Sequence, residues 1–254
     1  MLINTVVLFL RDTLPIFLLI SVLLALPGVT RKSLLVHGGV LIVLALITYS
    51  HLSWISEFAD GIGFELFKSF WLVVAWIGMC FIALLLPSRL TTNHIGVALL
   101  VLGIGLPNSL HFMVYFVSEL TRNNDSSLLL LGTTIGLGIC VSIAILLNIV
   151  LTHFLTPTMT YFFTSLFVAA QVANVALLLE QIDIFPAPYQ IWDSSRVVSD
   201  NSEYGHLLNA LIGYEATPSV SYLVLFIVTF CVPVVISVIS KSRHSREMSK
   251  EAAQ

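Results

Sequence analysis

The stretch Val7–Phe17 reads V-L-F-L-R-D-T-L-P-I-F and places Arg11, Asp12 and Pro15 inside an apolar run that extends from Met1 to about Val29. A run of this length can span a bilayer, and ionisable residues within a span are costly enough to indicate a functional site. In a helix, the ring of Pro15 removes the hydrogen bond to the carbonyl group of Arg11. We therefore expect a membrane helix whose backbone opens beside a charged pair.

A second stretch has a related pattern. Gly105–Tyr115 reads G-L-P-N-S-L-H-F-M-V-Y, in which Pro107 is followed by Asn108, Ser109 and His111. Aligned with R-D-T-L-P-I-F, the segment P-N-S-L-H-F-M matches a leucine with a leucine, a hydroxyl residue with a hydroxyl residue and a polar residue with a polar residue. Two interrupted, polar helices at corresponding places in two halves of a chain are the best sequence indication of a transporter's central site.

The composition decides the class of protein. The chain has 254 residues, of which 57% are hydrophobic and only 10% are charged, against about 25% charged in soluble domains. The mean hydropathy is +0.99. These values predict an all-α polytopic membrane protein surrounded by lipid. The net charge of −3 gives no indication of nucleic-acid binding, and no nucleophile with a base or glycine-rich phosphate loop indicates an enzyme.

Runs of about twenty apolar residues predict seven transmembrane helices. They are Ile3–Val29, Leu34–Ile55, Phe64–Leu86, Ile95–Leu120, Ser127–Leu151, Met159–Leu179 and Val220–Ile239. Basic residues follow spans one, three and seven, whereas acidic residues follow spans two, four and six. The positive-inside rule then places the N-terminus outside and the C-terminus in the cytoplasm. We expect a multi-pass protein of the bacterial inner (plasma) membrane.

The two polar stretches lie in spans one and four, which gives three spans in each unit, so a second three-helix unit would run upside down relative to the first. We predict one transmembrane domain over residues 1–240, with inverted repeats at about 1–86 and 95–180, an outside loop at 181–219 and a seventh helix at 220–239. A basic cytoplasmic tail would follow at 241–254. The outside loop is long enough to be an ordered docking surface for a periplasmic or membrane partner. Its Leu207, Leu208, Leu211 and Ile212 predict an amphipathic helix on the outer interface.

The sequence resembles the high-affinity iron permeases that work beside a ferroxidase or another periplasmic iron-handling protein. The segment Trp192–Ser221 carries the resemblance through Gly213-Tyr214, a short spacer and Pro218-Ser219, and T-S-L-F at Thr164–Phe167 is similar too. The resemblance implies seven spans, an outside N-terminus, inverted triplets and a role in iron transport.

The functional motif of that family diverges in this chain. The resemblance implies Arg-Glu-Gly-x-Glu in spans one and four, with glutamates that bind and pass iron. The corresponding positions are Arg11-Asp12-Thr13-Leu14-Pro15 and Pro107-Asn108-Ser109-Leu110-His111. An acidic pair near the start of span three has become Glu65 and Lys68. The predicted metal ligands are therefore Asp12, Asn108, His111 and Glu65, a set that suits a borderline divalent transition-metal ion better than ferric iron.

Two functions are consistent with these residues. The first is a transporter for iron or another transition-metal ion, with ligands on the two interrupted helices and Arg11, Pro15, Pro107, Ser109 and Lys68 in supporting positions. The second is a non-transporting subunit that keeps the permease fold and docks a cytochrome, an oxidase or another iron-handling protein through Gln181–Ser219. Haem is not expected as a cofactor, because His37 and His51 lie 14 apart in span two but no other helix offers a matching pair.

Overall fold

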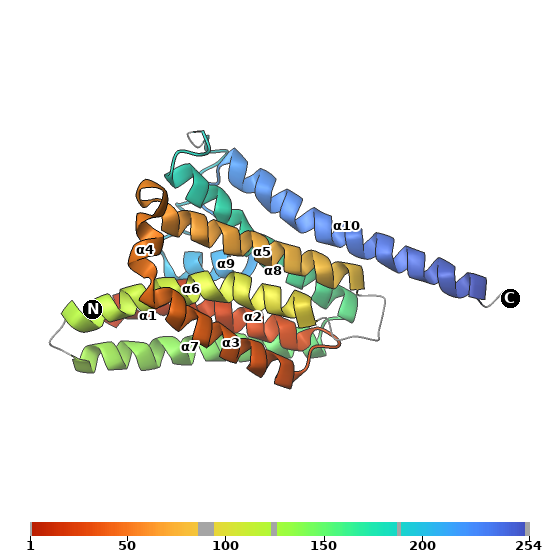
Figure 1. Cartoon of the computed structure of the whole chain (residues 1–254), viewed down its shortest axis with the longest axis horizontal. Coiled ribbons are helices and arrows are strands. Elements are labelled where there is room, and N and C mark those ends of the chain that lie inside the picture. Colours follow the sequence, from red (N-terminus) through yellow and green to blue (C-terminus); the bar gives the residue numbers. More distant parts are fainter. Residues whose placement is uncertain (1, 86–93, 123–125, 187–188, 252–254) are drawn as a thin grey trace.

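The structure, a computed structural model, describes residues 2–85, 94–122, 126–186 and 189–251 (Figure 1). Seven helices in these ranges are long and apolar enough to cross a membrane. The helical elements are α1 (Leu2–Leu8), the π-helical turn η1 (Phe9–Thr13), α2 (Leu14–Ala25), α3 (Arg31–Ser50), α4 (Leu52–Glu57), the 3-10 turn η2 (Phe58–Gly61), α5 (Gly63–Leu85), α6 (His94–Arg122), α7 (Ser126–His153), α8 (Pro157–Gln181), α9 (Glu203–Ile212) and α10 (Val220–Glu251). The predicted all-α polytopic fold is confirmed.

The first crossing opens beside the charged pair, as the sequence predicts. It consists of α1, η1 and α2, and the N–H group of Leu14 donates to the carbonyl group of Phe9, five residues back. Pro15 follows in the first turn of α2, where its missing N–H group is tolerated. Such wide turns are rare inside α-helices and occur frequently at functional sites. The proline has thus produced a π-turn rather than a complete break in the helix.

The fourth crossing differs from the prediction, because α6 continues without interruption through Pro107. Membrane helices tolerate an internal proline when neighbouring helices and side chains compensate for the lost backbone hydrogen bond. Here α6 packs between α3 and α5. The side-chain amide of Asn108 also donates to the carbonyl oxygen of Ile104 at 2.8 Å. Close packing against these two helices is consistent with the continuity of α6.

The second crossing of each predicted three-helix unit packs against the first crossing of the other unit. The second crossing, α3, packs against the fourth, α6, whereas the fifth, α7, packs along the first, α1 and α2. Helix α5 contacts α6 and α8, and α10 covers the outer side of α5 and α8. An inverted repeat would give this exchange of partners between its two units. The repeat itself stays a prediction.

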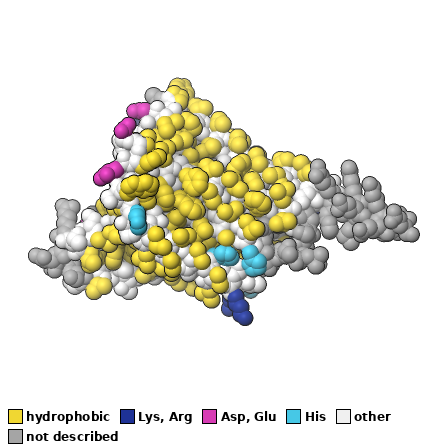
Figure 2. Space-filling view, viewed as in Figure 1, with side chains coloured by type: hydrophobic (Ala, Val, Ile, Leu, Met, Phe, Trp, Pro, Cys, Tyr) yellow, Lys and Arg dark blue, Asp and Glu magenta, His cyan; other side chains and the backbone are white. Residues whose placement is uncertain are grey.

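The outer surface of the bundle is apolar where lipid would surround it. Figure 2 shows hydrophobic side chains over most of the visible face, with acidic side chains at the α4 end and basic ones at the opposite end, near the start of α3. Exposed Leu35, Ile145 and Val238 represent α3, α7 and α10 on this surface. The distribution is that of a polytopic membrane protein, whose exposed helix faces contact lipid.

Two helix ends and the position of one helix differ from the sequence prediction. Span two ends at Ser50, because His51 has left the helical conformation and α4 begins a new direction. Helix α10 continues to Glu251, so residues 241–251 extend the seventh helix instead of forming a separate tail. The predicted helix in the 181–219 connection is present as α9, but it packs against α8, η1 and α2 instead of lying on the outer interface. Its Ala210 is buried in the main hydrophobic core.

Helices α5 and α6 approach each other closely at Gly103. A Cβ atom at this position would lie 2.6 Å from both the Cβ atom and the backbone nitrogen of Ala75, and 2.6 Å from the carbonyl oxygen of Trp71. Small residues at such crossings allow membrane helices to pack backbone to backbone. The same packing positions the polar residues of α5 relative to those of α6.

We predict that Gly103→Ala lowers the free energy of unfolding by about 1–3 kcal/mol, because the added methyl group forces the two backbones apart. The measurement is thermal unfolding of the purified protein in detergent micelles. Gly138→Ala is the matched control, since no atom lies within 4 Å of its added Cβ atom. Equal loss of stability in both variants would contradict the proposed close approach.

Candidate functional site

A polar cavity of about 620 Å³ lies between the first crossing, α5, α6, α8 and the 181–219 connection. Its lining includes most of the polar residues singled out in the sequence, together with residues of the connection. Its charged and amide side chains include Arg11, Asp12, Glu65, Lys68, Asn108, His111, Gln171, Asn174, Asp200, His206, Asn209 and Glu215. The cavity is therefore the candidate functional site.

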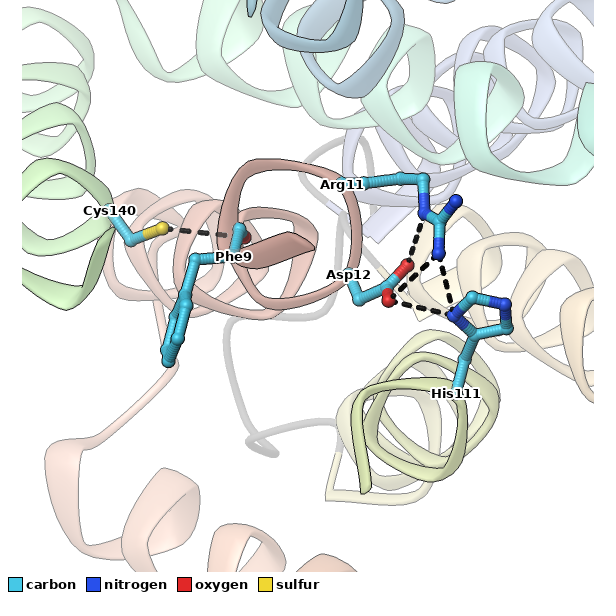
Figure 3. Close-up of polar contacts among 5 residues, drawn as sticks. All are labelled: Phe9, Arg11, Asp12, His111 and Cys140. Atoms are coloured by element: carbon cyan, nitrogen blue, oxygen red, sulfur yellow. Dashed lines mark hydrogen bonds and ion pairs between the residues drawn. The ribbon is translucent and has the colours of Figure 1, made fainter. Parts of the chain in front are cut away.

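The side chains of Arg11, Asp12 and His111 form one polar cluster at the π-turn (Figure 3). Asp12 Oδ2 lies 2.7 Å from His111 Nδ1, and Arg11 Nε donates to Asp12 Oδ1 at 3.1 Å. Consecutive residues of a regular α-helix do not face each other. Here the ion pair between two consecutive residues coincides with the widened turn. Because Asp12 belongs to the first crossing and His111 to the fourth, their contact brings these two crossings together at a shared polar centre, as the sequence predicts.

The short contact with Asp12 assigns the protons of His111. A carboxylate can only accept hydrogen bonds, so His111 Nδ1 carries the proton and donates it to Asp12. Arg11 Nη2, at 3.3 Å from the same nitrogen, is then a neighbour and not a donor to it. In a neutral imidazole this leaves Nε2 as an acceptor, on a side chain that is 30% exposed. A carboxylate orients metal-binding histidines in this way.

Glu65 and Lys68 lie on α5 one turn apart and both line the cavity. Neither forms an ion pair within 4 Å in the described part of the chain. Glu65 Oε2 is buried without a hydrogen-bond partner. Lys68 lies near enough to Asp12, Arg11 and Glu65 to interact with their charges. The cavity thus contains both an unpaired acid and an unpaired cation.

Three of the amide side chains that line the cavity belong to α6 and α8 and form hydrogen bonds to backbone carbonyl groups. The amide nitrogen of Asn108 bonds to Ile104 of its own helix, and that of Asn174 donates to the carbonyl group of Ala170 at 3.5 Å. Gln171 Nε2 donates to the carbonyl group of Ala210 in α9 at 3.0 Å. These bonds leave the amide oxygens as acceptors, and the bond from Gln171 holds α9 over the cavity.

The 181–219 connection forms one side of the cavity, which we call its roof. The roof carries two carboxyl groups and a histidine. Asp200 Oδ1 accepts a hydrogen bond from the backbone N–H group of Ala216 at 2.7 Å. Burial, with the adjacent Asp200, raises the pKa of Glu215 to about 7. Burial also lowers the pKa of His206, to which the positive charge of Arg11 contributes. Glu215 therefore changes charge near neutral pH, and His206 is held toward its neutral form.

The residues that carry the family resemblance fasten the connection in place. Gly213 ends α9 with a φ of 71°, a left-handed conformation that favours glycine. The hydroxyl group of Tyr214 bonds to Val198 and Ser194. Ser219 Oγ donates to Glu180 Oε1 at 2.6 Å. These residues hold the roof closed and do not line the cavity.

The structure brings together seven of the nine predicted site residues. Pro107 and Ser109 are not in the cavity lining, because they lie on other faces of α6. Sequence reasoning missed the roof residues, including Asp200, His206 and Glu215, which it assigned to a partner-docking loop. No local sequence pattern indicates this contact, because long stretches of chain separate these residues from the polar spans.

Metal ligation stays a prediction, and so does the expectation that haem is not a cofactor. Among the described residues, no group of three or more His, Cys, Asp or Glu side chains is arranged to hold a metal ion. His37 shares the hydroxyl group of Ser33 with His94, at 3.3 and 3.1 Å. His51 bonds to Ser50 and lies outside α3, so the two histidines weighed as haem ligands are not on one continuous helix.

The chain matches no protein-family model, and comparison with curated proteins and with solved structures finds no match.

The contact between Asp12 and His111 predicts a measurable coupling. We expect the losses of stability in Asp12→Asn and His111→Gln to be non-additive by about 1–3 kcal/mol, because either variant alone leaves a polar partner unsatisfied. The measurement is a double-mutant cycle of thermal or denaturant unfolding in detergent. Combining Asp12→Asn with His153→Gln, at an exposed position of α7, supplies the control cycle. Additive losses in both cycles would exclude the hydrogen bond.

The roof predicts a pH-dependent stability. The folded pKa of Glu215, about 7, exceeds its ordinary value of 4.5. The folded state therefore keeps a proton that the unfolded state releases, and stability falls as pH rises between these values. After allowing for solvent screening, we expect a loss of about 1–2 kcal/mol between pH 5 and pH 8.5. Glu215→Gln should match wild type at pH 5 and exceed it in stability at pH 8.5. The same difference at both pH values would refute the assignment.

Proposed function

We propose that the protein is an iron-permease-like membrane transporter that moves iron or another transition-metal ion through the polar cavity. The observation that carries the proposal is the 2.7 Å contact between Asp12 and His111, which joins the first and fourth crossings inside a cavity of about 620 Å³. A polar centre beside a local interruption of a membrane helix, here the π-turn at Arg11 and Asp12, is typical of transporter substrate sites.

The donor groups in the cavity suit a borderline divalent ion. His111 Nε2 is the best candidate ligand, because Asp12 orients its ring from the other nitrogen. Glu65 Oε2 has no hydrogen-bond partner, and the amide oxygen of Asn108 is not used by its own helix. Imidazole, carboxylate and amide together favour ferrous iron, copper or zinc over ferric iron.

Asp12 has a different role in this proposal from the other three residues. Its carboxylate already accepts bonds from Arg11 and His111 and is almost completely buried. We infer that Asp12 positions His111 and neutralises Arg11, and becomes a metal ligand only if Arg11 moves away. The proposed entry side is the end that carries the 181–219 connection, which the positive-inside rule places outside the cytoplasm.

A second candidate function is a non-transporting subunit in a membrane complex. The ion pair between Arg11 and Asp12 favours this function, because the carboxylate of Asp12 is then already neutralised within the protein. The connection also exposes Tyr189, Val197 and Tyr204, with Val197 84% accessible. These side chains would offer apolar contacts to a cytochrome, an oxidase or another iron-handling partner.

Uptake into proteoliposomes distinguishes the two functions. We expect ferrous or zinc uptake by wild type to fall at least tenfold in the double variant Asp12→Asn/His111→Ala, because the oriented imidazole is lost. The readout is intravesicular metal, measured by a fluorescent chelator.

His153→Ala serves as the matched control, because His153 is exposed at the end of α7. Its uptake should equal that of wild type. Background-level uptake in wild type and in both variants would exclude the transporter proposal. Co-purification of a stoichiometric membrane partner in mild detergent would then support the subunit proposal.

A further inference from the structure

The cavity has a cation that the protein does not neutralise by direct contact. Lys68 lines the cavity, and within the described ranges its ammonium group forms no hydrogen bond and no ion pair. Ionisable groups within membrane spans normally pair with one another or face a site of function. Since an ammonium group offers three donors, Lys68 presents an unsatisfied anion-binding group to the cavity.

Arg11 adds a second cationic group to the cavity, near enough to Lys68 for their charges to interact. Its Nε and Nη2 atoms face Asp12, but the structure gives Nη1 no hydrogen bond to the described residues. The side chain is 46% exposed although the neighbouring Asp12 is buried. The guanidinium fork can therefore bind a second carboxylate through its free edge while it keeps Asp12.

The cavity also has unused acceptors. Glu65 Oε2 is buried without a partner beside Lys68, and His111 Nε2 is available as a ligand. A bare anion would leave these acceptors unsatisfied, and a bare cation would meet Arg11 and Lys68. An occupant that combines a metal cation with an anionic chelator satisfies both sets of groups.

The size of the cavity agrees with a combined occupant. About 620 Å³ is within the range of small-molecule sites, about 300–1,000 Å³, and exceeds the space that one ion needs when its ligands lie about 2 Å away. A small organic acid with its metal ion fits this volume.

We propose that the cavity binds a small carboxylate anion between the guanidinium group of Arg11 and the ammonium group of Lys68, and that the metal cargo enters as a complex with this anion. The inference rests on the proposed function in treating the cavity as the substrate site. The carboxylate ligand is either the free acid or the acid that already holds the metal.

Binding to the purified full-length chain tests this inference. Isothermal titration in detergent micelles would use three probes: citrate, zinc citrate and zinc chloride. We expect Lys68→Gln to weaken binding of citrate or zinc citrate at least tenfold and Lys68→Arg to stay within about threefold of wild type, whereas binding of zinc chloride should not depend on Lys68. Lys241→Gln is the control, since Lys241 is exposed on α10 and outside the cavity lining.

Each outcome has one interpretation. Lys68-dependent binding of citrate without metal supports the inference with the free acid as a sufficient ligand. Lys68-dependent binding of zinc citrate only supports it with the metal complex as the ligand. Equal binding in wild type and Lys68→Gln, or no binding of either probe to wild type, overturns the inference. If Lys68→Gln does not fold, Arg11→Gln should weaken binding at least tenfold, and unchanged binding in that variant overturns it equally.

Failure of the carboxylate site can be separated from failure of transport. Metal uptake that depends on His111, without Lys68-dependent carboxylate binding, would retain the proposed function and reject this inference. Carboxylate binding that depends on Lys68, without uptake in proteoliposomes, would retain the anion site and reject metal transport.

Discussion

The bond between Asp12 and His111 is the interaction on which the centre of this structure depends. A carboxylate within a membrane span must be neutralised or hydrogen-bonded, and Asp12 obtains both from Arg11 and His111. This requirement fixes the first crossing against the fourth. Helix α7 supports the turn from the other side, where Cys140 Sγ donates to the Phe9 carbonyl group, at 3.5 Å (Figure 3). The π-turn is thus held between a polar contact and a packed helix.

The same constraint explains the inward position of α9. Polar walls within a bundle need either water or protein partners, because unsatisfied polar groups are costly when buried. Gln171 donates to the carbonyl group of Ala210 in α9, and the carboxyl groups of Asp200 and Glu215 then complete the upper part of the cavity. The apolar face of α9 packs on the core through Leu207 and Leu211. A connection that would otherwise be a surface loop therefore becomes the roof of a site.

The sequence predicts the parts of the structure that depend on local chemistry. The length of the apolar runs predicts seven crossings, because each run is continuous in the sequence. Pro15 predicts the opening beside Arg11 and Asp12, because it lies within a few residues of them. Pro107 misleads the same reasoning, since its effect depends on how tightly α3 and α5 hold α6. The roof residues are not predictable from local patterns, because a long loop can fold outward or inward with the same amphipathic spacing.

The balance of charge in the cavity decides which cargo it can hold. Two unit charges 4 Å apart interact by about 4 kcal/mol at an effective dielectric constant near 20. A metal ion that gained this energy from Glu65 would lose a similar amount beside Lys68, so a bare cation has little net attraction. A carboxylate that accompanies the ion reverses the second interaction and satisfies the free donors of Arg11. Under the proposed function, Lys68 would therefore change the form of the cargo instead of abolishing the site.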